Sequence, residues 1–473
     1  MKHIQRYLRF LFAENKYTNS TIPKESVRMK EVLFGYFLGP AGATLAGGVC
    51  TSFLNYYLTS VYFAGQPASV VAEYLVFLPL VSGGLIIAGN LFAGQLIEKT
   101  ETSQGKARPW ILISAVLLPI SCLMLFLLHP RNLAAKMLCL FLTYNLYYAV
   151  ASPLYSTANH TLIPLSTHDT QRRSLLATAS NTSGLAVMGF GSMVFPLLVG
   201  TVIVSQSHWA AAFVVLGVIS CFACILQYKF TRERVTENRV GHTQNRIPAR
   251  KQWKVAMSNR YWWIILVFHF VFQLGGSLKN LSMVYYCKHV LDSSFWGLAD
   301  GSGATQTLLS VAGAVPMALA VAVVWPLSNK IGKKNITALG LLIGVLGGII
   351  AAFGGSQILP VAAGIAIKSL GSAPACYLLL AMVSDCLDHI EAQTGLRCDG
   401  LTMSVYGSLM VAANCIAAAF FNGASNAGTD SVIISVSYIW IETAAFLICA
   451  VILWLFNVDN NNDAVAHCNV KES

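Results

Sequence analysis

Residues 110–128 read WILISAVLLPISCLMLFLL, a run without a single charged side chain. A helix of about 20 mostly apolar residues is long enough to cross the hydrocarbon core of a bilayer. The rest of the chain has the same character, because 55% of its 473 residues are hydrophobic and only 11% are charged. An average soluble domain is about 25% charged. The composition therefore argues against a soluble enzyme or a disordered chain and predicts a protein that crosses a membrane several times.

Twelve apolar runs of this kind follow one another in two groups of six. They cover approximately residues 32–63, 70–97, 110–128, 137–163, 174–204, 208–230, 261–285, 304–328, 336–353, 358–384, 401–423 and 432–457. A polar and basic linker, residues 231–260, separates the groups. We therefore predict an all-α membrane protein of twelve transmembrane helices in two six-helix bundles. The bundles are expected at residues 31–230 and 261–457, with tails at residues 1–30 and 458–473.

The basic residues test this topology. If both termini are cytoplasmic, 26 of the 31 lysines and arginines lie in the tails and inner loops, and three lie in outer loops. This asymmetry is typical of the positive-inside tendency of membrane proteins. The net charge of +11 is thus explained by orientation, and we expect no nucleic-acid partner. Most of the 12 cysteines lie inside apolar runs, where they act as small hydrophobic residues, and we predict no metal site.

Two basic turns occupy matching places in the two halves. Gly105-Lys106-Ala107-Arg108 follows the second run and Gly332-Lys333-Lys334 follows the eighth. Six helices, a central cytoplasmic loop and six more helices, with a repeat relating the halves, is the layout of the major facilitator fold. We therefore predict that fold, with both termini in the cytoplasm.

Four segments carry a resemblance to a known family. They are Gly105-Lys106-Ala107-Arg108-Pro109-Trp110, Ser152-Pro153-Leu154-Tyr155-Ser156, Tyr285-Tyr286-Cys287-Lys288-His289-Val290-Leu291, and the spaced set Asp385, Asp388, Glu391, Thr394, Gly395, Arg397, Asp399 and Gly400. In these segments the chain resembles the glycoside-pentoside-hexuronide:cation symporter family, to which melibiose permease belongs. The resemblance implies secondary transport of a sugar or glycoside, coupled to Na⁺ or H⁺, in a bacterial cell membrane.

One family feature is missing. The family's cation site resembles an acidic stretch on the second span, and here the aligned residues 86–94 read IIAGNLFAG. No Asp or Glu occurs between Glu73 and Glu98, so Asn90 offers only an amide oxygen. We keep cation-coupled symport as the expected mechanism, with an ion-independent facilitator as the alternative.

A neutral sugar can be held by amides, hydroxyls and aromatic faces. The candidate substrate-binding residues inside the predicted spans are Asn55, Tyr56, Asn90, Tyr148, Asn159, His160, Asn181 and Lys368. For each of the polar residues the alternative is a hydrogen bond between helices, which membrane bundles use widely.

Three charged residues lie well inside the apolar runs, away from their ends, namely Lys279, Lys368 and Glu442. Inserting a charge at the bilayer centre costs at least about 2.5 to 3.5 kcal/mol on insertion scales, so such residues usually face a cavity and serve a function. We expect Lys368 to face a central cavity, binding an acidic group of the substrate or replacing a coupling cation by its own charge. Packing or lipid contact is the favoured role of Glu442. The candidates for cation coupling are Asn90, Lys368 and Glu442.

The acidic cluster near the end of the tenth run predicts a cytoplasmic gate. Asp385, Asp388 and Glu391 are spaced by three residues and share a helix face, and Arg397 lies beyond the Thr394-Gly395 turn. The gate is expected to include these residues and the basic turns, with the members Lys106, Arg108, Lys333, Asp385, Asp388, Glu391 and Arg397. The alternative is a solvated loop.

Together these patterns predict a multi-pass transporter and not an enzyme, because neither a nucleotide-binding loop nor an H-E-x-x-H motif occurs. We expect a monomer in membrane lipid, a small-molecule substrate, and no cofactor besides a coupling Na⁺ or H⁺. Two further alternatives are a carrier of an amphipathic or sterol-like substrate and a membrane sugar sensor that does not transport.

Overall fold

The structure is a computed structural model of the whole chain. It describes residues 20–23, 27–98, 100, 102–167, 170–199, 203, 205–234, 249–297, 301–394, 399–424 and 430–456. Regular structure in these ranges is helical, apart from two isolated β-bridges, so the predicted all-α class is confirmed for them. The chain divides into two compact units, residues 1–65 with 81–243 and residues 66–80 with 244–473.

The first unit is built around the aromatic side chains of three helices. Phe126 stacks on Phe213 with their ring centroids 3.6 Å apart, and Tyr57 approaches Phe126 at 4.7 Å. The elements of this unit are η1 (Glu31–Leu38), α2 (Gly39–Tyr57), η2 (Leu58–Tyr62), α3 (Ala68–Glu98) from Val81 onward, α4 (Arg108–Leu127), α5 (Leu133–Asn145), η3 (Leu146–Ala151), α6 (Ser152–Ser166), α7 (Thr170–Gly189), η4 (Phe190–Val194), α8 (Phe195–Leu198) and α9 (Gln206–Lys229).

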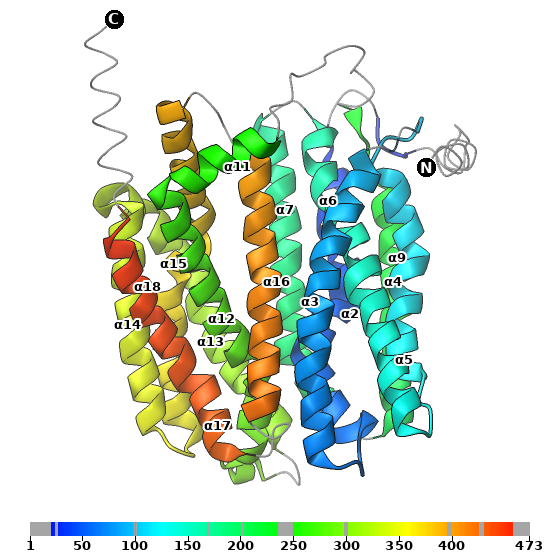
Figure 1. Cartoon of the computed structure of the whole chain (residues 1–473), viewed down its shortest axis with the longest axis vertical. Coiled ribbons are helices and arrows are strands. Elements are labelled where there is room, and N and C mark those ends of the chain that lie inside the picture. Colours follow the sequence, from blue (N-terminus) through cyan, green and yellow to red (C-terminus); the bar gives the residue numbers. More distant parts are fainter. Residues whose placement is uncertain are drawn as a thin grey trace, which may run out of the picture. The chain divides into compact units, whose positions relative to one another are not determined.

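The second unit has its core where Trp262, Leu379 and Phe446 pack together, all of them buried. Its elements are the first part of α3, α11 (Ala249–Ser258), α12 (Arg260–His289), η5 (Ser293–Trp296), α13 (Ser302–Ile331), α14 (Lys333–Phe353), α15 (Ile358–Thr394), α16 (Asp399–Ala424), α17 (Ser431–Ser435), η6 (Val436–Trp440) and α18 (Ile441–Trp454). Figure 1 shows α11 running crosswise to α12 and α16, both of which it contacts.

Eleven helical segments among the described residues are long and apolar enough to cross a membrane. The fifth predicted span, residues 174–204, is not one of them. Its place is taken by α7, η4 and α8, and α7 is rich in polar residues such as Arg172, Ser180 and Asn181. The number of twelve transmembrane helices therefore remains a prediction.

The predicted linker, residues 231–260, contains a helix that the sequence patterns did not indicate. This helix, α11, ends at Ser258, and the next residue, Asn259, starts α12 as its N-cap. The Asn259 side chain accepts hydrogen bonds from the backbone N–H groups of Tyr261 and Trp262, at 2.9 and 3.3 Å. Such a cap satisfies donors that a helix start leaves without partners.

Candidate translocation site

Three charged side chains from three helices meet inside the second unit. Glu442 of α18 lies between two lysines, with Oε1 3.1 Å from Lys279 Nζ of α12 and Oε2 2.8 Å from Lys368 Nζ of α15. Lys368 Nζ also donates a hydrogen bond of 3.0 Å to the backbone carbonyl of Ile439. We call Lys279, Lys368 and Glu442 the charged triplet.

Glycines bring the three helices close enough for these contacts. A Cβ atom on Gly275 would lie 2.8 Å from Ala445 Cβ, and one on Gly347 would lie 2.4 Å from the backbone nitrogen of Lys368. Small residues of this kind let helix backbones in membrane proteins approach each other closely. Gly275 therefore allows α18 to pack closely against α12 one turn before Lys279. Gly347, on α14, likewise allows α15 to approach α14 closely at Lys368.

The two lysines differ in access. The side chain of Lys368 is 2% exposed and that of Glu442 is 5% exposed, whereas the side chain of Lys279 is 27% exposed. Removing charges from water is costly unless they are paired with good geometry, and Glu442 supplies that pairing. With two ammonium groups and one carboxylate in their ionised forms, the triplet carries one surplus positive charge.

This placement differs from two sequence-based expectations. Lys368 does not face an open cavity here, because α18 covers it and Glu442 and the Ile439 carbonyl bind its ammonium. Of the two roles expected of Glu442, packing fits and lipid contact does not, since its side chain is buried between two cations. The roles of Lys368 and Glu442 in substrate binding and cation coupling stay predictions.

Polar side chains lie near the triplet on α12. Gln273 and Ser277 are half-buried and Asn280 is exposed. The Ser277 hydroxyl donates a hydrogen bond to Asn414 Oδ1 of α16. Cys376 of α15 is exposed and lies within electrostatic reach of Lys279 and Glu442.

Asn159, a predicted substrate ligand, belongs to a buried network in the first unit. Its Nδ2 donates to Ser180 Oγ at 3.3 Å, and its Oδ1 accepts from Gln227 Nε2 at 2.7 Å. Gln227 Oε1 in turn accepts from the Tyr155 hydroxyl at 2.7 Å. The network joins α6, α7 and α9, which is the helix-to-helix hydrogen bonding that the sequence left as the alternative.

The other predicted substrate residues of the first unit lie in several places. Asn90 is half-buried, and its Nδ2 donates to the carbonyl of Ile86 on its own helix at 3.0 Å. Asn55, Tyr56 and Tyr148 are half-buried. His160 is exposed on α6, and the side chain of Asn181 lies outside the described residues. Contact of any of them with substrate remains a prediction.

Part of the predicted gate forms a contact in the second unit. Lys333 Nζ, at the start of α14, lies 2.6 Å from Asp385 Oδ2 of α15. Asp388 and Glu391 are exposed on α15, and Arg397 lies outside the described residues. The pair Lys333–Asp385 thus ties two neighbouring helices of one unit, and a role in gating remains a prediction.

The basic turn of the first unit is held by the start of the linker. The carboxylate of Glu233 accepts hydrogen bonds from the backbone N–H groups of Lys106, Ala107 and Arg108, at 2.8, 2.8 and 2.9 Å. Gly105 has a positive φ of 107°, and a Cβ there would lie 2.3 Å from Glu233 Cδ. Anions are stabilised at a helix N-terminus. Glu233 therefore anchors the start of α4.

Arg108 is buried within this anchor. Its guanidinium donates to the Gln104 side chain at 3.0 Å and to the backbone carbonyl of Tyr228 at 3.0 Å. All these partners belong to the first unit. These contacts join the ends of α4 and α9, and a role of Arg108 in gating remains a prediction.

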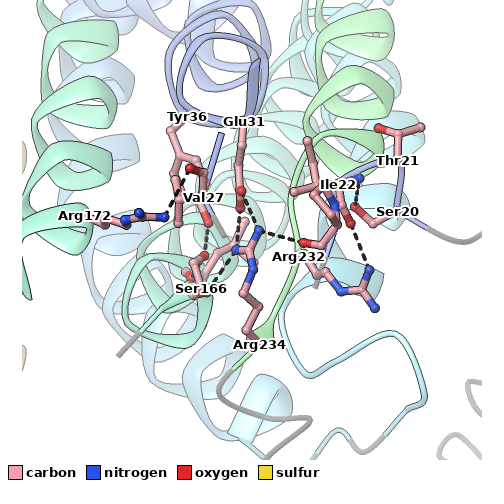
Figure 2. A network of polar contacts seen from close by, with 12 residues as sticks. Ser20, Thr21, Ile22, Val27, Glu31, Tyr36, Ser166, Arg172, Arg232 and Arg234 are labelled. Carbon is pink, nitrogen blue, oxygen red and sulfur yellow. Dashed lines mark hydrogen bonds and ion pairs between the residues drawn. The ribbon is translucent and has the colours of Figure 1, made fainter. Parts of the chain in front are cut away.

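A neighbouring network connects Ile22 and Glu31, which precede or begin the first helix, to the end of α6 and to the first linker residues (Figure 2). Arg234 forms an ion pair of 2.8 Å with Glu31 at the start of η1 and donates to the Ser166 carbonyl at 3.1 Å. Arg232 donates to the Ile22 carbonyl at 2.9 Å. The first linker residues thus bind the ends of several helices together.

Sequence reasoning named all three members of the charged triplet but did not pair them. A signal was present, because a lone carboxylate and two lone ammonium groups in apolar spans must neutralise one another to be buried cheaply. Glu31, Glu233 and Arg234 were missed altogether. Their partners lie more than 100 positions away along the chain, and no local pattern marks such pairs.

Long apolar helices with a few buried charges are typical of a multi-pass membrane protein. The chain belongs to the MFS/sugar transport protein family, whose model matches residues 35–460. It is similar to the isoprimeverose transporter of Lactiplantibacillus pentosus, with 25% identity covering 93% of this chain and 91% of the relative. It is also similar to the glucuronide carrier protein homolog of Escherichia coli (strain K12), with 25% identity covering 79% of this chain and 78% of the relative.

Solved structures support the fold. The crystal structure of the nucleoside transporter NupG matches with a TM-score of 0.60 and 13% identity, covering 90% of this chain and 99% of that one. The peptide transporter POT in complex with sulfate matches with a TM-score of 0.62 and 14% identity, covering 92% and 96%. The transporter fold and the membrane location predicted from sequence are confirmed.

Proposed function

We propose that this protein is a secondary transporter that moves a sugar or glycoside across the cell membrane by alternating access. The observation that carries the proposal is the match to a sugar-transport family over residues 35–460. The names of two relatives, an isoprimeverose transporter and a glucuronide carrier homolog, support a glycoside, neutral or acidic, as the substrate. A monomer in membrane lipid suffices for this mechanism, because each major facilitator fold contains both repeats.

The proposal includes twelve transmembrane helices and cytoplasmic termini. Eleven segments among the described residues meet the length and hydropathy expected of a span. Helices α7, η4 and α8 supply a further long helical stretch, Thr170–Leu198. The strong asymmetry of the basic residues supports an even number of crossings.

We further propose that binding uses accessible polar groups rather than the buried network at Asn159. Asn55, Tyr56, Asn90 and Tyr148 are half-buried and His160 is exposed, so their amide, hydroxyl and imidazole groups are the first candidates. Coupling to Na⁺ or H⁺ remains part of the proposal. Glu442, which pairs with Lys279 and Lys368, is the one coupling candidate that carries a carboxylate.

An ion-independent facilitator is the second candidate, and one observation favours it. No Asp or Glu occurs between Glu73 and Glu98, and the Asn90 amide donates to its own helix. A sodium ion needs several oxygen ligands to replace its lost hydration, and Asn90 supplies only one side-chain oxygen.

Uptake into proteoliposomes tests both candidates. Purified protein is reconstituted and given a panel of radiolabelled glycosides under an inward Na⁺ gradient, an inward H⁺ gradient, or neither. Accumulation that needs one gradient identifies a symporter and its ion. Equilibration that is indifferent to both gradients identifies a facilitator, and no flux of any glycoside contradicts the proposal of sugar transport.

A further inference from the structure

The surplus positive charge of the charged triplet has a definite location. Lys368 and Glu442 are both almost fully buried and 2.8 Å apart, so together they form a neutral pair. Lys279 shares the same carboxylate at 3.1 Å but keeps 27% of its side chain exposed. The charge that Glu442 does not neutralise therefore resides on the accessible ammonium, Lys279.

This ammonium is accessible to water rather than to lipid. A charge that faced the hydrocarbon core without a partner would cost several kcal/mol. Two observations agree with this: Asn280, the next residue on α12, is exposed, and the exposed Cys376 of α15 lies within electrostatic reach of Lys279. The exposed part of Lys279 therefore borders an aqueous path.

We propose that Lys279 is a specificity-determining residue that selects substrates with an acidic group, a carboxylate or a sulfonate, over neutral ones. The proposal rests on the transport function proposed above and names its substrate class. An ammonium has three N–H donors, and the described partner of Lys279 is one carboxylate oxygen of Glu442. Two donors and a net positive charge therefore remain for the oxygens of an incoming acid.

The surplus positive charge also favours an acidic group over a neutral one at this position. Hydrogen bonds between charged groups are stronger than those between neutral groups. Because Glu442 also pairs with Lys368, it neutralises the charge of Lys279 only in part. An acidic substrate would complete a balanced set of two cations and two anions. A neutral sugar would leave the surplus charge uncompensated.

The test compares two probes that differ at one carbon. Phenyl β-D-glucuronide carries a carboxylate where phenyl β-D-glucoside carries a hydroxymethyl group. We expect wild-type proteoliposomes to take up the glucuronide at least tenfold faster, expressed as kcat/KM. Lys279→Gln should reduce this preference at least tenfold, and Lys279→Arg should keep it within about threefold, because Arg retains the charge.

Lys288→Gln is the matched control. Lys288 lies on the same helix, is exposed, and stands nine residues beyond Lys279, so its loss should leave the preference unchanged. Equal uptake of both probes by the wild type overturns the proposal. So does a Lys279→Gln variant that keeps the preference of the wild type.

Cys376 supplies a readout that does not need transport. Its labelling by an anionic and a cationic methanethiosulfonate reagent is followed at this site by mass spectrometry, with Cys376→Ser as the blank. We expect Lys279→Gln to lower the ratio of anionic to cationic labelling at least threefold. We also expect the glucuronide, but not the glucoside, to protect Cys376 in the wild type.

The two readouts separate the inference from the function on which it rests. If no glycoside is transported but the glucuronide protects Cys376, the transport proposal fails and the anion site stands. If glycosides are transported without charge preference and without protection of Cys376, the anion site fails and the transport proposal stands.

Discussion

At the scale of residues, the stability of the second unit depends on Glu442. We expect Glu442→Gln to lower the apparent melting temperature of the purified protein, because it leaves Lys368 buried without a countercharge. Breaking a buried ion pair from one side typically costs about 3 to 5 kcal/mol. The measurement is thermal unfolding in detergent, followed by the fluorescence of a thiol-reactive dye on newly exposed cysteines.

The double variant Lys368→Met/Glu442→Gln provides the control. It removes the buried ammonium together with the carboxylate, so that no buried charge of this pair is left without its partner, which is the costly case. We therefore expect it to recover most of the lost melting temperature. A double variant less stable than Glu442→Gln would mean that the charges are not coupled in this way.

At the scale of elements, the contact between α14 and α15 depends on a residue without a side chain. We expect Gly347→Ala to destabilise the protein, because the added Cβ would lie 2.4 Å from the backbone nitrogen of Lys368 and would push α15 away from α14. Gly407→Ala in α16 is the matched control. A Cβ there meets nothing within 4 Å, and Ala is favoured over Gly in a helix by about 1 kcal/mol.

Thermal unfolding of the two variants checks this expectation. Gly347→Ala should melt at a lower temperature than the wild type, and Gly407→Ala should melt at the same temperature or above it. If both variants behave alike, the close approach at Gly347 does not limit the packing of these helices.

Sequence patterns predicted the helices and the class of fold but not the contacts between distant segments. Apolar runs and basic loops predicted the helices and the class of fold, because each depends on composition over a single segment. The contact of Gly275 with Glu442 and that of Glu233 with the turn at Lys106 join segments that are far apart in the chain. Their geometry is set by tertiary packing. Sequence patterns alone therefore do not indicate that Glu442 and the Ile439 carbonyl bind the Lys368 ammonium, or that Glu233 holds the basic turn at Arg108.

At the scale of the whole molecule, the fifth predicted span decides the topology. If α7, η4 and α8 cross the membrane, the chain crosses twelve times and both tails lie on the same side. If they do not, eleven crossings place the tails on opposite sides. We expect twelve, because 26 of the 31 basic residues then share one side.

Whether the number of crossings is even or odd can be measured with a protease site inserted in either tail of the full chain. In inside-out vesicles both sites should be cleaved, and in right-side-out vesicles neither should be cleaved until detergent is added. A third site, inserted at Arg131 between α4 and α5, is the control and should behave in the opposite way, since that loop is expected outside. Cleavage of one tail in each kind of vesicle would establish an odd number of crossings. The basic residues of one half would then lie on the outer side, and the positive-inside asymmetry could no longer explain their distribution.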